Sequence, residues 1–127
     1  MKRAQYLFLV ALALTLAVGV AWAQRPATFE GTLVDSLCYL KDNSLTGNDH
    51  GPMKDCGTMC LRGGTPAGLL TRDKNFQPIL APSLALAPYV GQTVRINGTL
   101  RNGAILASKV EVNKAGTWEE VKLGGMM

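Results

Sequence analysis

The chain has 127 residues, a formal net charge of +4, and 47% hydrophobic residues. This length fits one domain rather than two. The basic residues are dispersed and are not interleaved with aromatic side chains, so we expect no nucleic-acid partner.

The N-terminal segment has the pattern of a secretory signal peptide. Two basic residues precede an apolar run over 6–20, and the Ala-Trp-Ala sequence that ends at Ala23 provides a small-x-small cleavage site. We therefore expect residues 1–23 to be a signal peptide and residues 24–127 to form one exported domain, periplasmic or secreted, with no membrane span after cleavage. The apolar run approaches the minimum length of a membrane span, so an uncleaved anchor is the alternative.

The first half of the domain predicts a strand, a loop and a helix in that order. The stretch 28–40 indicates a strand, because its side chains alternate over 29–34. Residues 41–53 are rich in Asn, Asp and Gly and predict a loop. Residues 52–64 predict a short helix, with Pro52 in its first turn and Gly63 at its end.

Two short strands and a helical segment follow. Residues 66–71 and 75–81 predict a pair of strands joined by a tight turn. Residues 82–91 fit one or two helical turns, with Ser83 as the expected N-cap.

The clearest pattern in the chain is a hairpin over 92–112. Asn102-Gly103 is the dipeptide favoured in a two-residue turn, and Gly98 predicts a bulge because alternation continues across it. A further short strand is expected near 118–123. On the return strand of the hairpin, four residues are expected on one face: Leu106, Ser108, Val110 and Val112.

These elements predict a mainly β domain, a small five-stranded OB-like barrel. A short helix would lie between the third and fourth strands, as in OB-folds, and a Cys-rich helical insertion at about 38–64 would lie between the first and second. Other small barrels are alternatives, and the fold alone assigns no function.

Chemistry-bearing residues gather in this insertion. Cys38, His50, Cys56 and Cys60 form the pattern C-x11-H-x5-C-x3-C. Cys56 and Cys60 share one face of the predicted helix because they are four residues apart. Three thiolates and an imidazole suit tetrahedral Zn²⁺, or Cu(I), which prefers soft ligands. The predicted metal ligands are therefore these four residues, with zinc or copper as the cofactor.

Two alternatives remain for the cysteines. Export favours a disulfide from Cys38 to Cys56 or Cys60, since an i,i+4 pair on a helix is poorly oriented for bonding. Such a bridge, closing a loop of about 20 residues, would stabilise the domain by roughly 3 kcal/mol. The other alternative is a reactive thiol at Cys56, near a helix N-terminus and beside Lys54.

Neighbouring residues have competing interpretations as well. His50 alone would be a solvated loop histidine, and its position before two cysteines makes it a candidate ligand. Asp35 is either a strand-end turn residue or an acceptor that orients a ligand. The thioethers of Met53 and Met59 would suit copper better than zinc, although Met59 is expected in the core.

The chain resembles a group of small exported bacterial OB-like proteins with no assigned activity. The shared pattern is D-x-x-C at Asp35 to Cys38, a His-containing loop, C-x3-C, and a G-x-P-x-G-like turn at 64–68, and the similarity covers about 28–113. The resemblance implies that the three cysteines belong to one site, with His50 matched less closely. It implies no activity.

We therefore expect a binding module rather than an enzyme, since no paired carboxylates or Ser-His-Asp arrangement is present. The first hypothesis is an exported module that binds zinc or copper through the Cys/His cluster. The alternative is an envelope ligand- or protein-binding module whose insertion is held by a Cys38 disulfide, without metal. The expected partner is an envelope protein or a small ligand, and the expected state is a monomer.

Overall fold

A computed structural model describes residues 25–124, so the predicted signal peptide at 1–23 lies outside the described residues. The chain folds mainly into strands, with a few short helices placed between them. The elements in chain order are β1 (Ala27–Asp35), α2 (Ser36–Lys41), α3 (Cys56–Arg62), β2 (Ala67–Leu70), β3 (Phe76–Leu80), α4 (Ser83–Leu86), the 3₁₀ turn η1 (Ala87–Tyr89), β4 (Thr93–Arg101), β5 (Ala104–Lys114) and β6 (Thr117–Val121).

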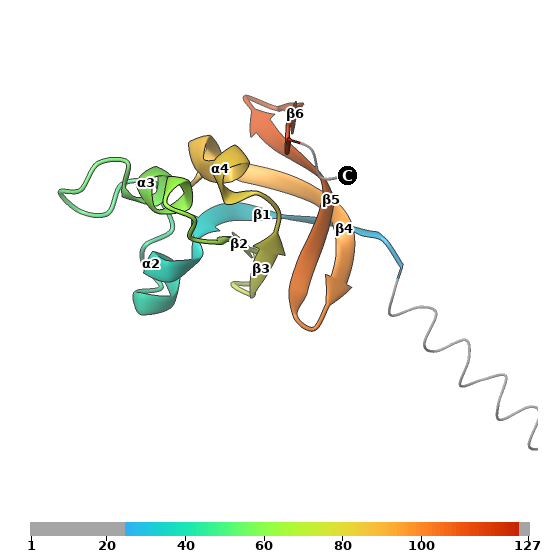
Figure 1. Ribbon diagram of the computed structural model, residues 1–127, viewed down its shortest axis with the longest axis horizontal. Helices are drawn as coiled ribbons and strands as arrows, with labels where there is room; N and C mark the ends of the chain where they lie inside the picture. Colours follow the sequence, from blue (N-terminus) through green and yellow to red (C-terminus); the bar gives the residue numbers. More distant parts are fainter. Residues whose placement is uncertain (1–24, 125–127) are drawn as a thin grey trace, which may run out of the picture.

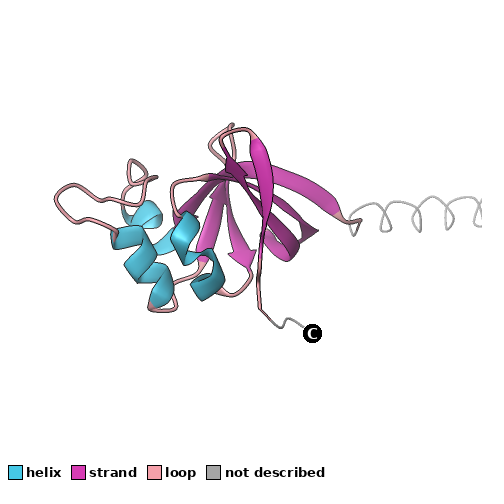
Figure 2. Cartoon of the chain, turned by 90° about the horizontal axis from the view of Figure 1, so that it is seen from above, coloured by secondary structure: helices cyan, strands magenta, loops and turns pink. Residues whose placement is uncertain are grey.

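The strands form one six-stranded sheet in the order β3-β2-β1-β4-β5-β6, with antiparallel neighbours. A parallel pairing of Ile79 and Leu80 with β5 joins β3 to β5, so that hydrogen bonding passes in a ring through five strands. The sixth strand, β6, lies within the tail where a further strand was expected. The helices gather at one end of the curled sheet (Figures 1 and 2).

Successive side chains of β1 point to opposite faces of the sheet and contribute to two separate apolar clusters. Leu33 points into the main core, which also takes Leu61 from α3. Val34 points to the outer face, where Tyr39 of α2 stacks on Phe76 of β3 with ring centroids 5.3 Å apart. The first strand therefore anchors the barrel interior and the α2 helix at once. The rest of the main core is made of buried aliphatic residues from the other elements except α2, among them Leu69, Ile79, Leu86, Val94, Ile96, Ile105 and Val112.

The four residues expected on one face of β5 lie on two faces, and a bulge is the reason. Asn97 pairs with Lys109 while Gly98 pairs with Ala107, which leaves Ser108 as an extra residue on β5. The extra residue inverts the alternation, so Val110 and Val112 are buried as expected whereas Leu106 and Ser108 are exposed. Two neighbours take their places in the core: Ile105 and Ala107.

The helices differ from expectation in three places. The α2 helix was not predicted, because residues 36–41 continue the apolar run of the first strand. The α3 helix begins at Cys56 rather than near Pro52, since Asp55 before it has a left-handed backbone (φ 54°). The α4 helix has Pro82 at its N-cap position, so Ser83 is its first residue and not its cap.

Replacing Gly98 by alanine is expected to destabilise the barrel by about 1–3 kcal/mol, the usual range for overpacking a core. A Cβ at this position would overlap the Leu106 backbone oxygen, which cannot move without disturbing the β4–β5 pairing. Urea unfolding measures the loss. The control is Gly63→Ala, where the new Cβ would meet the carbonyl oxygens of Cys60 and Met59 at 3.4 and 3.5 Å, which is ordinary contact, and a change within about 0.5 kcal/mol is expected. Equal losses of stability in the two variants would contradict the close approach of Gly98 to the Leu106 backbone.

Candidate metal centre

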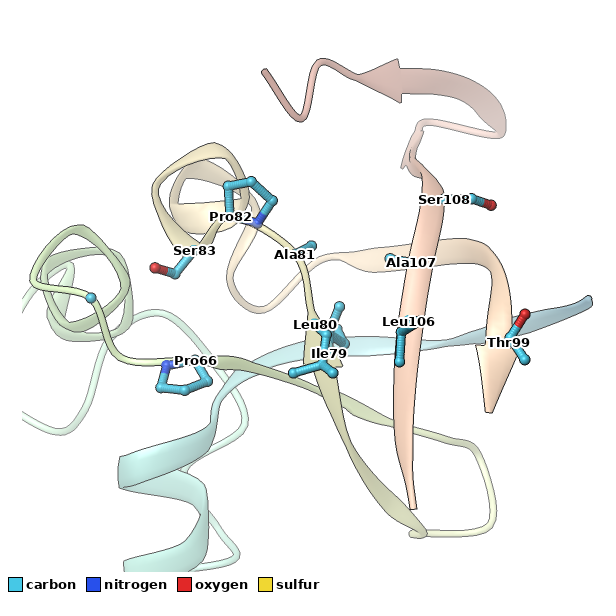
Figure 3. A pocket seen from close by; sticks show the side chains of 11 residues that line it. Pro66, Ile79, Leu80, Ala81, Pro82, Ser83, Thr99, Leu106, Ala107 and Ser108 are labelled. Atoms are coloured by element: carbon cyan, nitrogen blue, oxygen red, sulfur yellow. The ribbon is translucent and has the colours of Figure 1, made fainter. Parts of the chain in front are cut away.

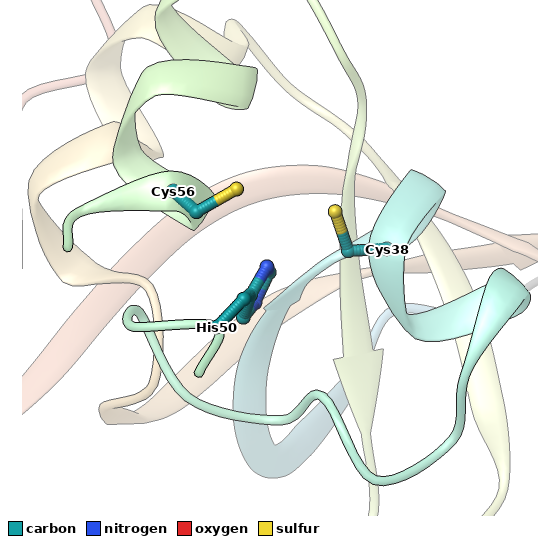
Figure 4. A group of neighbouring side chains, drawn as sticks. All are labelled: Cys38, His50 and Cys56. Atoms are coloured by element: carbon teal, nitrogen blue, oxygen red, sulfur yellow. The ribbon is translucent and has the colours of Figure 1, made fainter. Parts of the chain in front are cut away.

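Three segments bring two thiols and an imidazole together at the helical end of the barrel. Cys38 comes from α2, His50 from the loop between α2 and α3, and Cys56 from the first residue of α3. One ligand atom from each residue lies within 4.8 Å of the other two. The imidazole points into the space between the two sulfur atoms (Figure 4). We call these residues the first group.

A second group shares one of these cysteines. Asp35, Cys38 and Cys60 each offer an atom within 4.8 Å of the other two. All four predicted ligands therefore lie close enough to hold a metal ion, but they divide between two sets of atoms rather than converging at one point. Asp35, which the sequence suggested only as a turn residue or orienting acceptor, lies beside the Cys38 and Cys60 thiols.

Asp35 also determines where α2 begins. Its Oδ1 accepts a hydrogen bond from the Leu37 backbone N–H at 3.0 Å, which caps the helix. The Tyr39 ring then holds the same helix against Phe76 on the outer face of the sheet. Cys38 lies between the cap and the ring contact. The helix that carries its sulfur is therefore held by a local cap and by a contact with β3, which is distant in sequence.

Asn48 fixes the loop that carries the histidine. Its backbone carbonyl accepts from the Gly57 N–H at 2.9 Å, and its side-chain oxygen accepts from the Thr58 N–H at 2.8 Å. Asp49 adds a second connection, since its carboxylate accepts from the Asp55 N–H at 2.8 Å and pairs with Lys54 at 2.9 Å. These bonds hold the loop against the N-terminal end of α3, where Cys56 lies.

His50 is buried, with 4% of its surface exposed, rather than solvated. Its backbone forms a closed turn with Met53, and its ring Nε2 lies 3.1 Å from the Gly47 carbonyl oxygen. A carbonyl can only accept, so Nε2 carries the proton and donates, which leaves the lone pair on Nδ1. Nδ1 is buried and has no hydrogen-bond partner. A histidine that donates one N–H to a backbone carbonyl and keeps the other nitrogen free has the arrangement typical of metal ligands.

All three cysteines lie within the described residues and carry free thiols. The structure therefore contains neither of the expected disulfides, from Cys38 to Cys56 or to Cys60, although the sulfur atoms are near one another. Burial, followed by the adjacent Asp35 carboxylate, raises the pKa of Cys38 from 9.0 to about 12. The same two causes raise the pKa of Cys60 from 9.0 to about 11. Both thiols are protonated at neutral pH, which does not favour them as nucleophiles.

The metal-free protein is expected to lose stability as the pH rises from about 9 toward 11–12. The unfolded chain releases thiol protons near pH 9, whereas folded Cys38 and Cys60 retain theirs to about 12 and 11. Because the folded state then binds more protons, the stabilisation is complete below pH 9 and falls above it. Thermal unfolding between pH 8 and 11 measures the slope. Cys60→Ser should reduce that slope, and an unchanged slope would contradict the pKa assignment.

A surface hollow of about 480 Å³ gives solvent access to the helix thiols. It is lined by Cys56 and Cys60 together with Met53, Lys54 and Met59. Met59 was expected in the core, but 67% of its surface is exposed, because this face of α3 points away from the barrel. The thiols are therefore reachable from solvent, and two thioethers lie at the entrance.

A larger groove of about 910 Å³ is lined by residues of β3 and β5 and by the segment that follows β3 (Figure 3). Its lining is mostly apolar, with Ile79, Leu80 and Leu106 prominent, and it contains no titratable side chain. The groove offers apolar contact area, whereas the metal-ligating chemistry lies in the insertion.

Comparisons of the chain with protein-family models, curated proteins and solved structures gave no match. Within residues 25–124, no helix has both the length and the apolar character needed to cross a bilayer. The interpretation of the site therefore depends on its own geometry and chemistry.

Proposed function

We propose that this protein is an exported module that binds a transition metal ion through the Cys/His cluster of its insertion. The observation that carries the proposal is the first group, in which Cys38, His50 and Cys56 offer ligand atoms within 4.8 Å of one another. In addition, His50 has a buried nitrogen without a partner. Cys60, the fourth predicted ligand, lies within 4.8 Å of Cys38 in the second group.

The distances support a tetrahedral ion of modest size. Ligand atoms bonded to zinc at about 2.0–2.3 Å lie roughly 3.3–3.8 Å apart. Atoms already within 4.8 Å can reach that spacing through small side-chain rotations. Thiolate and imidazole ligands suit zinc, and the soft sulfur atoms also suit Cu(I). Zinc and copper are therefore the metals to test.

We further propose an OB-like barrel for the domain and a periplasmic or secreted location. The closed order of five strands and the helical segment between β3 and β4 support the barrel type. The basic, apolar and small-residue pattern of 1–23 supports export. Protein recovered from a secreted or periplasmic fraction should begin at Gln24, and a mass that includes residues 1–23 would contradict cleavage.

The metal-binding test is a competition titration of the reduced full chain against a chromophoric chelator, with Zn²⁺ and Cu(I) in separate experiments. At least one equivalent of one metal should bind tightly, and binding should protect the thiols from alkylation. His50→Ala should weaken binding at least about 10-fold, because a ligand contributes no less than the outer residues that orient it.

The matched control is Asn43→Ala, a substitution at an exposed position of the same loop, which should leave the affinity unchanged. Failure of the wild-type chain to bind either metal would overturn the proposed function. Equal affinities for wild type and His50→Ala would remove the histidine from the site while leaving the cysteines.

A further inference from the structure

The five candidate ligands are arranged around Cys38. This thiol is the only member common to both groups, with His50 and Cys56 on one side and Asp35 and Cys60 on the other. A site for one ion would require Cys60 to lie beside His50 and Cys56, whereas its sulfur lies within 4.8 Å of ligand atoms of Asp35 and Cys38. The arrangement therefore favours two neighbouring positions over one.

Asp35 provides an independent indication of a cation. Its side chain is 1% exposed, and Oδ2 is buried without a hydrogen-bond partner. The cap of α2 uses only Oδ1 and so does not account for the other oxygen. A buried carboxylate oxygen without a partner is costly unless a cation or a donor compensates it. One carboxylate oxygen of Asp35 lies within 4.8 Å of the thiols of Cys38 and Cys60, and thiols are only weak donors.

Metal binding changes what Asp35 faces. Thiols bind metals as thiolates, so their protons leave when an ion enters. The Asp35 carboxylate then lies beside negatively charged sulfur atoms, and no S–H group remains there to donate to it. Three thiolates and one carboxylate carry four negative charges, which one divalent ion balances only by half. Two divalent ions balance them fully.

We propose that the cluster holds two zinc ions bridged by the Cys38 thiolate. The first ion is held by Cys38, His50 and Cys56, and the second by Cys38, Cys60 and Asp35. Binding of both ions releases three thiol protons to solvent, and the resulting cluster is neutral. Carboxylate, imidazole and thiolate are all zinc ligands, whereas a carboxylate is a poor ligand for Cu(I). This inference rests on the proposed function and specifies its metal and stoichiometry.

The test is zinc stoichiometry of the reduced full chain, measured by mass spectrometry under non-denaturing conditions and by chelator competition. Wild type should bind two equivalents. Asp35→Asn should bind one, and its new amide oxygen can still accept from Leu37, so α2 keeps its cap. Cys60→Ser should also bind one, which gives a second variant if Asp35→Asn does not fold. Asp42→Asn removes the same charge at an exposed position just beyond α2 and should bind two.

Cobalt(II) substitution tests the bridge itself. A shared thiolate couples the spins of two cobalt ions, so the electron paramagnetic resonance signal should rise with the first equivalent and fall with the second. One zinc equivalent in wild type, unchanged in Asp35→Asn, would overturn the two-ion cluster but preserve the proposed metal site. Two equivalents in Asp35→Asn would also overturn it. Absence of any bound zinc or copper would overturn both proposals.

Discussion

Replacement of Cys38 by serine is expected to weaken metal binding at least about 100-fold, the largest effect of any single cysteine substitution. Removing even an outer residue that orients a metal ligand typically costs 10–100-fold, and Cys38 is itself a ligand in both groups. Its loss therefore removes one ligand from each group at once. Chelator competition with Zn²⁺ on the reduced chain measures the change.

Cys60→Ser is the matched control for this substitution. Cys60 belongs only to the second group, so the first group of Cys38, His50 and Cys56 remains complete. We expect the tightest zinc equivalent of this variant to bind with nearly wild-type affinity. If Cys38→Ser and Cys60→Ser weakened the tightest site equally, the central position of Cys38 would be wrong.

Replacement of Leu61 by alanine is expected to cost about 3–5 kcal/mol of unfolding free energy, which is a large share of the stability of a domain of this size. Leu61 is fully buried and carries the α3 helix into the main core. The cavity left by its side chain would lie where α3 packs against η1, α4 and β1. Urea unfolding of the metal-free, reduced chain measures the loss without a contribution from bound ions.

Leu84→Ala provides the same chemical change on a helix at the same end of the barrel. The Leu84 side chain is 66% exposed, so its loss should change stability by no more than about 0.5 kcal/mol. A comparable loss in the two variants would mean that α3 does not close the core. We also expect Leu61→Ala to weaken zinc binding, because Cys56 and Cys60 lie on the helix that it loosens.

The mainly β character and most of the strands could be predicted from the sequence because their signals are local. The β4–β5 hairpin follows from strict alternation and the Asn102-Gly103 turn, and both strands formed where expected. The bulge at Gly98 was also expected, and the register shifts there. The effect of the bulge on β5 could not be predicted, since a glycine in one strand does not show which strand holds the extra residue.

The candidate site was predicted as a set of residues but not as a geometry. The types and spacing of the three cysteines and His50 indicate soft-metal ligands. Their division into two groups depends on the residue at which β1 ends and α2 begins. The capping role of Asp35 determines that residue. The sequence contains one indication that a helix begins here, the aspartate two residues before Leu37. An aspartate at this position is equally compatible with a strand that simply ends. The burial of His50 depends on contacts with Gly47 and on the Asn48 bonds that hold its loop.

The insertion leaves and rejoins the barrel at adjacent positions. Asp35 and Ala67, which flank it, are paired residues of the antiparallel strands β1 and β2. For protein engineering, the whole segment is therefore equivalent to a hairpin loop. The distance between its two ends is that of any pair of facing residues in an antiparallel hairpin. The segment is not independent of its host, because Leu61 reaches into the main core and Tyr39 stacks on Phe76 of β3. A transplanted version would need a recipient with an apolar depression beside the hairpin, and such a graft would carry its metal ligands with it as one contiguous peptide.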